Sequence, residues 1–236
     1  AYLISNFSLG NKATNLEISL ACYKISLSVF SRDRHPEIWA TIQNNLGNLY
    51  QDRIQGEMAT NMEMAIAAFQ SALGVRTKDA FPQEIKNSEW EAGVLKSLGS
   101  AYHSLGQYEK AVDFFQQSLP IYRELKDGKG EANILKDLAF LFRELEDRER
   151  EADVLNILGV AYSYLGQYER AINFYEQSLP IYREIKNPQG EADVLNNLGL
   201  AYYFQGQDKK AIDVLQQSLS IYRKLKDRGK LKDLEG

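Results

Sequence analysis

The sequence contains few of the residues from which disulfides, metal sites and membrane spans are built. Cys22 is the only cysteine, so no disulfide can form within the chain and no cysteine-based metal site is available. The two histidines lack cysteine partners, and we therefore predict no metal site. Proline occurs only five times and no stretch is rich in proline, serine or glycine, which predicts no disordered linker. No window approaches the roughly 18 consecutive apolar residues of a membrane span.

An excess of positive charge is also missing. The formal net charge is -4, from 28 basic and 32 acidic residues. This argues against nucleic acid as a main partner, because phosphate binding needs a concentrated basic face. Residues 1–6 lack the basic start and the long apolar run of a signal peptide. We therefore expect a cytoplasmic protein that binds neither nucleic acid nor a membrane.

Three common catalytic motifs are absent as well. The sequence has no Walker-type phosphate loop, no HExxH metal motif and no GxSxG nucleophile elbow. Paired carboxylates such as Asp153 and Asp193 are suited to acid–base chemistry. They recur with an internal repeat, however, which favours their interpretation as polar residues near helix starts. We predict that the chain is not an enzyme and uses no cofactor.

What the sequence does contain is an internal repeat. Residues 151–156 and 191–196 both read EADVLN, at a spacing of 40. Three stretches read QSLPIYR or QSLSIYR: residues 117–123, 177–183 and 217–223. Self-similarity at such a period is typical of repeat architectures.

The spacing of the repeat divides the chain into two segments. Residues 1–90 carry repeats spaced by 46, the first of them truncated, as the match of residues 13–17 with residues 59–63 indicates. Residues 91–236 carry repeats spaced by 40. Within the second segment the unit at 131–150 is shortened.

Each repeat has the pattern of two helices. A glycine follows a leucine inside each first helix, at Gly47, Gly99, Gly159 and Gly199. Such a glycine costs about 1 kcal/mol relative to alanine, so its recurrence predicts that a neighbouring helix approaches too closely for a side chain. A second set, Gly106, Gly166 and Gly206, is expected to break the chain between the two helices.

The pattern resembles the tetratricopeptide repeat, in which a large apolar residue, Leu-Gly, Tyr, Ala and Phe recur along a helix-turn-helix. One copy consists of Leu95, Leu98, Gly99, Tyr102, Ala111 and Phe115. The departures are leucine in place of the usual tryptophan, no proline at the repeat end, and a period of 40, which resembles cell-polarity adaptors, kinesin light chains and bacterial multi-repeat proteins. The resemblance implies an all-α fold, a right-handed α-solenoid of antiparallel helix pairs.

The resemblance also implies a function in protein binding. In the family, first helices line the concave face of the superhelix, and the matching positions here predict a groove for a protein or peptide. These positions are Asn44, Asn48, Gln51, Lys96, Ser100, His103, Asp153, Asn156, Ser163, Asp193, Asn196 and Tyr203. Asparagine recurs at one place in three repeats. These asparagines, Asn44, Asn156 and Asn196, either form hydrogen bonds with the backbone of an extended peptide, or solvate the groove, or form hydrogen bonds with a neighbouring helix.

Two functional hypotheses follow. The first is a scaffold or adaptor whose groove binds a peptide or a partner domain. The alternative is a regulatory or sensor segment of a larger protein that carries an effector enzyme domain, such as a protease or a nucleotide-dependent switch.

The shortened unit leads to a structural prediction of its own. No glycine or proline occurs from Glu131 to Leu158, and the pairs Glu144/Arg148 and Glu146/Arg150 have helix-supporting spacing. We therefore predict one continuous helix over residues 131–165, with a turn at residues 147–149 as the competing outcome. Half of so long a helix would be uncovered by its neighbours. Either a gap between two sub-arrays or a homodimer formed through the long helix would follow.

Overall fold

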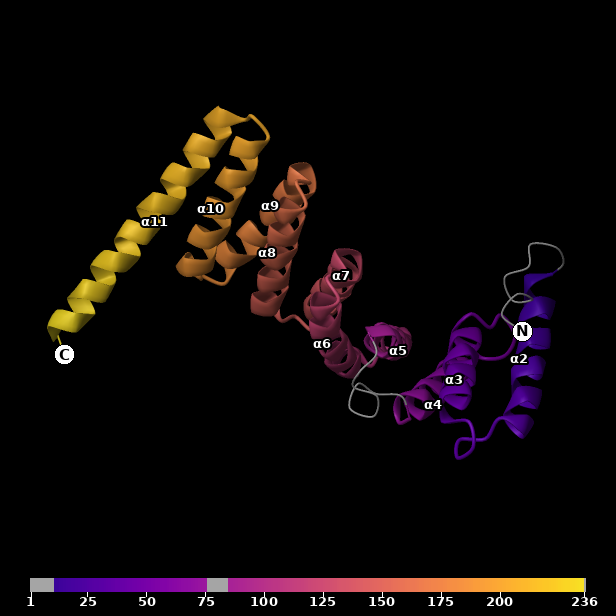
Figure 1. The fold of residues 1–236 in the computed structure, drawn as a ribbon. Helices are drawn as coiled ribbons and strands as arrows, with labels where there is room; N and C mark the ends of the chain where they lie inside the picture. Colours follow the sequence, from indigo (N-terminus) through magenta and orange to yellow (C-terminus); the bar gives the residue numbers. More distant parts are fainter. Residues whose placement is uncertain (1–10, 76–84, 236) are drawn as a thin grey trace. The chain divides into compact units, whose positions relative to one another are not determined.

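The computed structural model describes residues 11–75 and 85–235, and every regular element in these residues is an α-helix. The all-α repeat fold predicted from the sequence is thereby confirmed (Figure 1). The helices are α2 (Lys12–Val29), α3 (Pro36–Gln51), α4 (Met58–Leu73), α5 (Ile85–Ser104), α6 (Tyr108–Glu124), α7 (Gly128–Glu144), α8 (Arg148–Tyr164), α9 (Tyr168–Glu184), α10 (Pro188–Phe204) and α11 (Asp208–Glu235). The predicted truncation of the first repeat falls on residues 1–10, outside the described residues.

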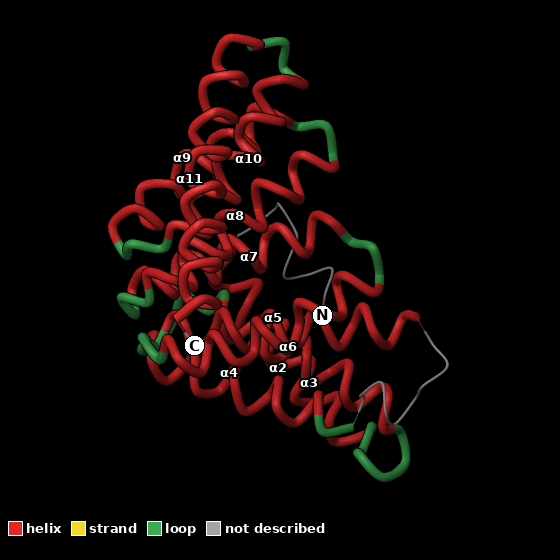
Figure 2. Tube along the Cα trace, turned by 90° about the vertical axis from the view of Figure 1, so that its left-hand side faces the viewer, coloured by secondary structure: helices red, strands yellow, loops and turns green. Residues whose placement is uncertain are grey.

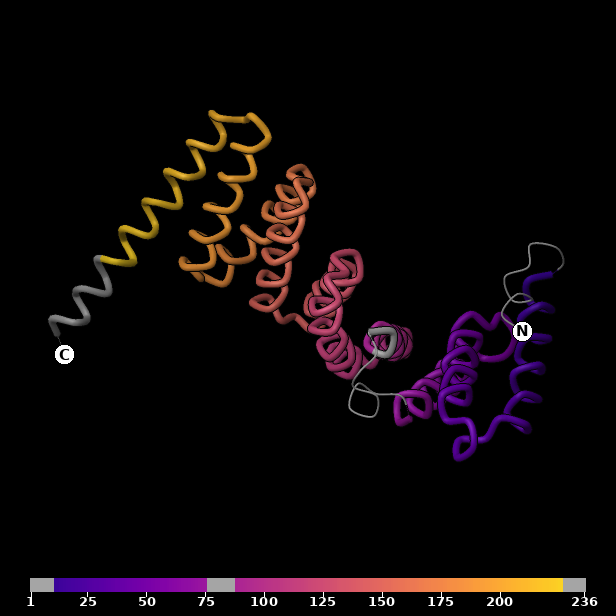
Figure 3. Tube along the Cα trace, in the orientation of Figure 1, coloured from indigo at the N-terminus to yellow at the C-terminus, as the bar shows by residue number. Residues whose placement is uncertain are grey.

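The helices form two compact units, Ala1–Asp127 (unit 1) and Gly128–Gly236 (unit 2). In unit 1, α3 pairs with α4 and α5 pairs with α6. In unit 2, α8 pairs with α9 and α10 pairs with α11, while α7 packs on α8 and α9 packs on α10. The first helices α8 and α10 also contact each other, and Figure 3 shows α7 to α11 following one another in chain order. The division by repeat spacing at residue 90 stays a prediction.

The turn inside each later repeat depends on glycine. Gly106, Gly166 and Gly206 have φ angles of 70°, 70° and 76°, a left-handed conformation that side chains resist. After Gly106, the Gln107 N–H returns to the Tyr102 carbonyl at 3.0 Å. This bond satisfies a carbonyl that the helix end would otherwise leave unpaired. The predicted breaks are confirmed, and Figure 2 shows the short loops that result.

The predicted continuous helix over residues 131–165 is wrong. α7 ends at Glu144 and α8 begins at Arg148. Glu146 between them has a φ of 56°, the same left-handed value as Lys126 (55°) and Lys186 (54°) in the corresponding turns. The competing outcome, a turn, is therefore correct, although it lies one or two residues earlier than predicted.

The turn forms without glycine because a helix cap offsets its cost. The Asp147 side chain accepts a hydrogen bond from the Arg150 N–H at 3.0 Å and pairs with its guanidinium at 2.6 Å. Asn187 caps α10 in the same way, at Gly190 N–H. An Asp or Asn cap contributes roughly 1 kcal/mol, comparable with the strain of one left-handed residue. Arg148 pairs with Glu151 and Glu184 rather than with Glu144.

With the long helix gone, the reason for a homodimer through it is gone as well. The segment from 128 to 144 is one ordinary helix of 17 residues, as α8, α9 and α10 are. Its C-terminal half is covered within the fold: Leu141 and Phe142 are buried. The uncovered half that would have recruited a second copy therefore does not exist.

The glycines inside the first helices do meet a close neighbour, as predicted. A Cβ added at any of them would lie under 3.0 Å from a side chain of the paired second helix. The pairs are Gly47 with Phe69, Gly99 with Phe115, Gly159 with Tyr175 and Gly199 with Leu215. The large side chain is buried in the first three, at 0%, 1% and 2% exposure. In each of these four helix pairs, a large side chain of the second helix packs directly against the glycine of the first helix.

Candidate partner-binding surface

A row of apolar side chains, half-buried at one residue and exposed at the others, lies on the first helices of unit 2. On α8 it consists of Ile157, Val160 and Tyr164, and on α10 of Leu200 and Phe204; we name these five residues the apolar strip. Positions three and four apart share one helix face. Tyr164 is 89% exposed and Phe204 60% exposed. Unit 2 therefore presents apolar surface that its own helices do not cover.

The same positions in unit 1 are polar. Where α8 has Ile157, Val160 and Tyr164, the helix α3 and its end carry Asn45, Asn48 and Asp52, and α5 carries Ser97, Ser100 and Ser104. The shared Leu-Gly pair of each first helix sets this correspondence. The apolar strip is thus a feature of unit 2 and not a requirement of the repeat.

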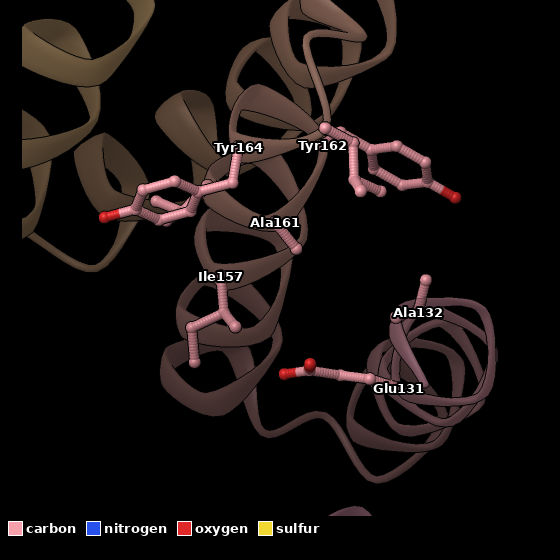
Figure 4. Close-up of a pocket in the computed structure, with 9 residues that line it drawn as sticks. Glu131, Ala132, Ile157, Ala161, Tyr162 and Tyr164 are labelled. Carbon is pink, nitrogen blue, oxygen red and sulfur yellow. The ribbon is translucent and has the colours of Figure 1, made fainter. Parts of the chain in front are cut away.

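Two cavities flank α8 beside the strip. The first, of about 310 Å³, lies between the start of α7 and α8, and its walls include Gly128, Glu131, Ala132, Ile157 and Ala161 (Figure 4). The second, of about 400 Å³, lies among α8, α9 and α10, and its walls include Ser163, Tyr168, Asn197, Leu200 and Phe204. Val160 and Tyr164 belong to both. The strip and the cavities therefore form one continuous surface.

The groove residues predicted in unit 1 lie on α3 and α5. Asn44, Lys96 and Ser100 are half-buried, and Asn48 is exposed. The Gln51 side chain donates to the Ser97 carbonyl at 3.1 Å, which ties α3 to α5. The half-buried His103 ring lies 5.9 Å from the Tyr108 ring.

In unit 2 several predicted residues bond to neighbouring helices. Asn156 accepts a hydrogen bond from Asn197 at 3.1 Å, and Ser163 lies 3.3 Å from the Tyr175 hydroxyl. The first contact matches the alternative in which asparagine bonds a neighbouring helix. Asn196 is half-buried. Tyr203, which is 60% exposed, packs edge-to-face on Phe204 and so flanks the strip. Whether any of the twelve contacts a partner stays a prediction.

Sequence reasoning missed the apolar strip because it selected polar positions. In α8 these residues lie one before, two after and six after the leucine of the Leu-Gly pair, and in α10 they lie two after and six after it. The position two after the leucine was chosen only in unit 1, at Asn48 and Ser100. A usable signal was present, since the change from Asn48 and Ser100 to Val160 and Leu200 is visible in the aligned repeats. An exposed apolar residue is informative only in a group, and the grouping across α8 and α10 requires the fold.

The two recurring aspartates, Asp153 and Asp193, join the helices of a repeat. Asp153 accepts a hydrogen bond from the Tyr182 hydroxyl, and Asp193 accepts one from Tyr222. Burial, followed by the bond to the carboxylate, raises the pKa of Tyr182 well above its ordinary value and that of Tyr222 to about 12. In both cases the neutral phenol is the form that donates, so the folded state holds its proton.

Raising the pH above about 10 is therefore expected to destabilise unit 2, and Tyr182→Phe should reduce this pH dependence. In the unfolded chain both phenols ionise near pH 10. Because their folded pKa values are higher, the stabilisation is fully present below pH 10 and is lost as the pH rises toward about 12. Denaturant midpoints measured by circular dichroism across this range test it. Tyr164→Phe, at an exposed ring, is the control and should retain the parent's slope.

Two family models, both described as tetratricopeptide repeat, match the chain: one at residues 39–80, the other at residues 90–156 and 150–224. The second model alone covers more than half of the sequence. The chain belongs to the tetratricopeptide repeat family. No curated protein matches the sequence. The family resemblance inferred from the Leu-Gly, Tyr, Ala and Phe pattern is confirmed.

Several solved structures are similar to this chain at low sequence identity. The apo form of RapI is 12% identical, covers 96% of either chain and superposes with a TM-score of 0.51. BtubC (BKLC) from P. vanneervenii is 20% identical over 89% of this chain and 92% of its own, with a TM-score of 0.40. The TPR2AB domain of yeast Sti1, solved in complex with pHSP90, is 18% identical over 89% and 72%, with a TM-score of 0.41. At 12% identity the likeness to RapI shows the fold alone.

Metal-binding clusters and membrane-spanning helices were both sought in the described part of the tetratricopeptide chain. Among residues 11–75 and 85–235, no group of three or more His, Cys, Asp or Glu side chains could hold a metal ion. None of the helices searched there is both long and apolar enough to cross a membrane. No enzyme family is indicated by the models that match.

Proposed function

We propose that this tetratricopeptide chain is a scaffold or adaptor module that binds a peptide or a partner domain on the first helices of unit 2. Tetratricopeptide repeats are protein-interaction modules, and the observation that supports this site is the apolar strip. Contiguous apolar surface exposed to water is unfavourable by about 25 cal/mol per Å². Such patches on soluble proteins mark interaction sites.

The contrast between the units strengthens the proposal. Each repeat needs its buried leucines, tyrosines and glycines, but the strip positions are outside that core. Unit 1 shows that polar side chains are compatible with these positions, at Asn48 and Ser100. The repeat therefore does not require apolar residues at Val160 and Leu200, and burial against a partner is a simple use for them.

The polar residues around the strip would orient the bound chain. Asn156 and Asn197 already bond to each other and keep further donor and acceptor capacity. Ser163 and Tyr203 lie beside the second cavity and beside Phe204, respectively. An apolar centre with a polar rim is the usual anatomy of a protein interface. The alternative, a regulatory or sensor segment of a larger protein that carries an effector enzyme domain, stays a prediction.

Leu200→Glu tests the surface. The side chain is 44% exposed, so the change should leave helical content and melting temperature nearly unchanged. Partner capture by affinity purification, with cross-linking to locate the contact, should fall at least tenfold, because a carboxylate would be desolvated in an apolar interface.

The matched control is Ser100→Glu, the same helix position in α5 of unit 1. It introduces the same charge on a polar face, and capture should stay at the parent level. Loss of binding in the Ser100 variant with retention in the Leu200 variant would instead assign the interface to the polar face of α3 and α5. If both variants captured the partner as well as the parent does, the interface would lie away from the first helices.

A further inference from the structure

The cavity between α7 and α8 exists because two residues at the start of α7 are small. One repeat later, at a spacing of 40, α9 begins with Tyr168 where α7 begins with Gly128, and has Ile172 where α7 has Ala132. A Cβ added at Gly128 would meet no atom within 4 Å. The space that a tyrosine ring and part of an isoleucine fill beside α10 is therefore open beside α8.

The equivalent place between α9 and α10 is filled, and it shows which kind of side chain fits the cavity. The Tyr168 ring stacks on the Phe204 ring, with centroids 5.3 Å apart and planes 15° apart. Phe204 occupies the position in α10 that Tyr164 occupies in α8. Offset stacking of this kind adds to the burial of the two rings. The empty cavity therefore has the backbone frame of the Tyr168 site, but a glycine, Gly128, where α9 carries its tyrosine.

The walls and the mouth of the cavity suit an aromatic side chain that arrives from outside. Ile157, Ala132 and Ala161 supply apolar walls, and Glu131 brings a half-buried carboxylate to one side (Figure 4). The Tyr164 ring is turned away from Glu131 and Ala132, which leaves the mouth open. Exposed side chains change rotamer within nanoseconds, so Tyr164 can close on an entering ring. A volume of about 310 Å³ is at the small end of ligand sites and fits one large side chain.

We propose that the cavity between α7 and α8 receives a tyrosine or phenylalanine side chain of the protein partner, which takes the place that Tyr168 holds one repeat later. The proposal rests on the proposed function, because the partner supplies the ring. It is continuous with the apolar strip, since Ile157, Val160 and Tyr164 belong to both. The partner's aromatic anchor would thus enter beside α8 while neighbouring residues lie along the strip toward α10.

N-acetyl-tyrosinamide, a neutral mimic of the side chain, is the probe for the complete chain. In two-dimensional amide spectra it should shift the signals of Ala132, Ala161 and Leu165 saturably, with a dissociation constant on the order of a millimolar. N-acetyl-alaninamide should not. Gly128→Ala leaves the ring-sized space open and should bind as the parent does. Gly128→Tyr supplies the missing ring and should weaken binding at least tenfold.

A second filled variant, Ala132→Ile, repeats the test with the residue found at this position in α9. Loss of binding in both filled variants, with retention in Gly128→Ala, supports the proposal. Unsaturable shifts in the parent, or equal binding by Gly128→Tyr and the parent, overturns it. Leu200→Glu lies outside this cavity and should bind the amide normally. If the Gly128→Tyr variant still captures the partner and the Leu200→Glu variant does not, the cavity proposal alone is overturned. If the Leu200→Glu variant still captures the partner and the parent still binds the amide, the proposed binding on the apolar strip is overturned instead.

Discussion

Replacing Gly159 by leucine is expected to lower the free energy of unfolding of unit 2 by about 3 kcal/mol, at the upper end of overpacking effects. Leucine is the better helix former by nearly 1 kcal/mol, so the helix alone would favour the change. The added Cβ, however, would lie under 3.0 Å from the Tyr175 ring. That ring is 2% exposed and closed in by its neighbours, so α8 and α9 must separate to admit the side chain.

The location of the tryptophans allows the loss of stability in the Gly159→Leu variant to be assigned to one of the two units. Trp39 and Trp90, the two tryptophans of the chain, both lie in unit 1. Far-UV circular dichroism should therefore show an early transition in the Gly159 variant, while the tryptophan fluorescence midpoint stays near that of the parent. Gly93→Ala is the matched control, because Gly93 also lies inside a first helix but has nothing within 4 Å. It should stabilise unit 1 by up to about 1 kcal/mol. A Gly159 variant as stable as the parent would show that the contact is not rigid.

Phe69→Ala should destabilise unit 1 by about 3–5 kcal/mol, the range for a buried aromatic residue. The Phe69 ring is fully buried on Gly47 and joins α3 to α4. Its removal leaves a cavity that the paired helices close only in part. Tryptophan fluorescence should report the loss directly, since Trp39 lies on α3 and Trp90 on α5, which packs on α4.

A double-mutant cycle distinguishes the Gly47 contact from general loss of apolar burial. Gly47→Ala should be destabilising in the parent, where its Cβ meets the ring, and close to neutral or stabilising in the Phe69→Ala background. Met64→Ala, on α4 of unit 1 at a residue 41% exposed, should cost less than about 1 kcal/mol. Additive effects of the Gly47 and Phe69 changes would contradict the seating of the ring on the glycine.

The turn at Glu146 shows where reasoning from composition was misled. The absence of glycine and proline between α7 and α8 predicted continuity, yet Lys126 and Lys186 adopt the same left-handed conformation in the turns that do have glycine or proline nearby. The informative residue was the Asp or Asn that follows, at Asp147 and Asn187, because its side chain caps the next helix. Asp127, Asp147 and Asn187 follow one another at spacings of 20 and 40, and this recurrence would have predicted the turn.

The sequence by itself determined the repeat, the pairing of helices and the size rule at Gly159 and its equivalents. These properties are local or periodic: helix formation depends on neighbours three and four residues away, and a glycine that recurs against its helix propensity requires a close contact. Only the tertiary structure decided which surface is available for a partner. Tyr164 and Leu200 join one strip, and Gly128 opens a cavity beside Ile157, because packing brings together residues about 30 to 40 positions apart, whose individual exposure no periodicity specifies.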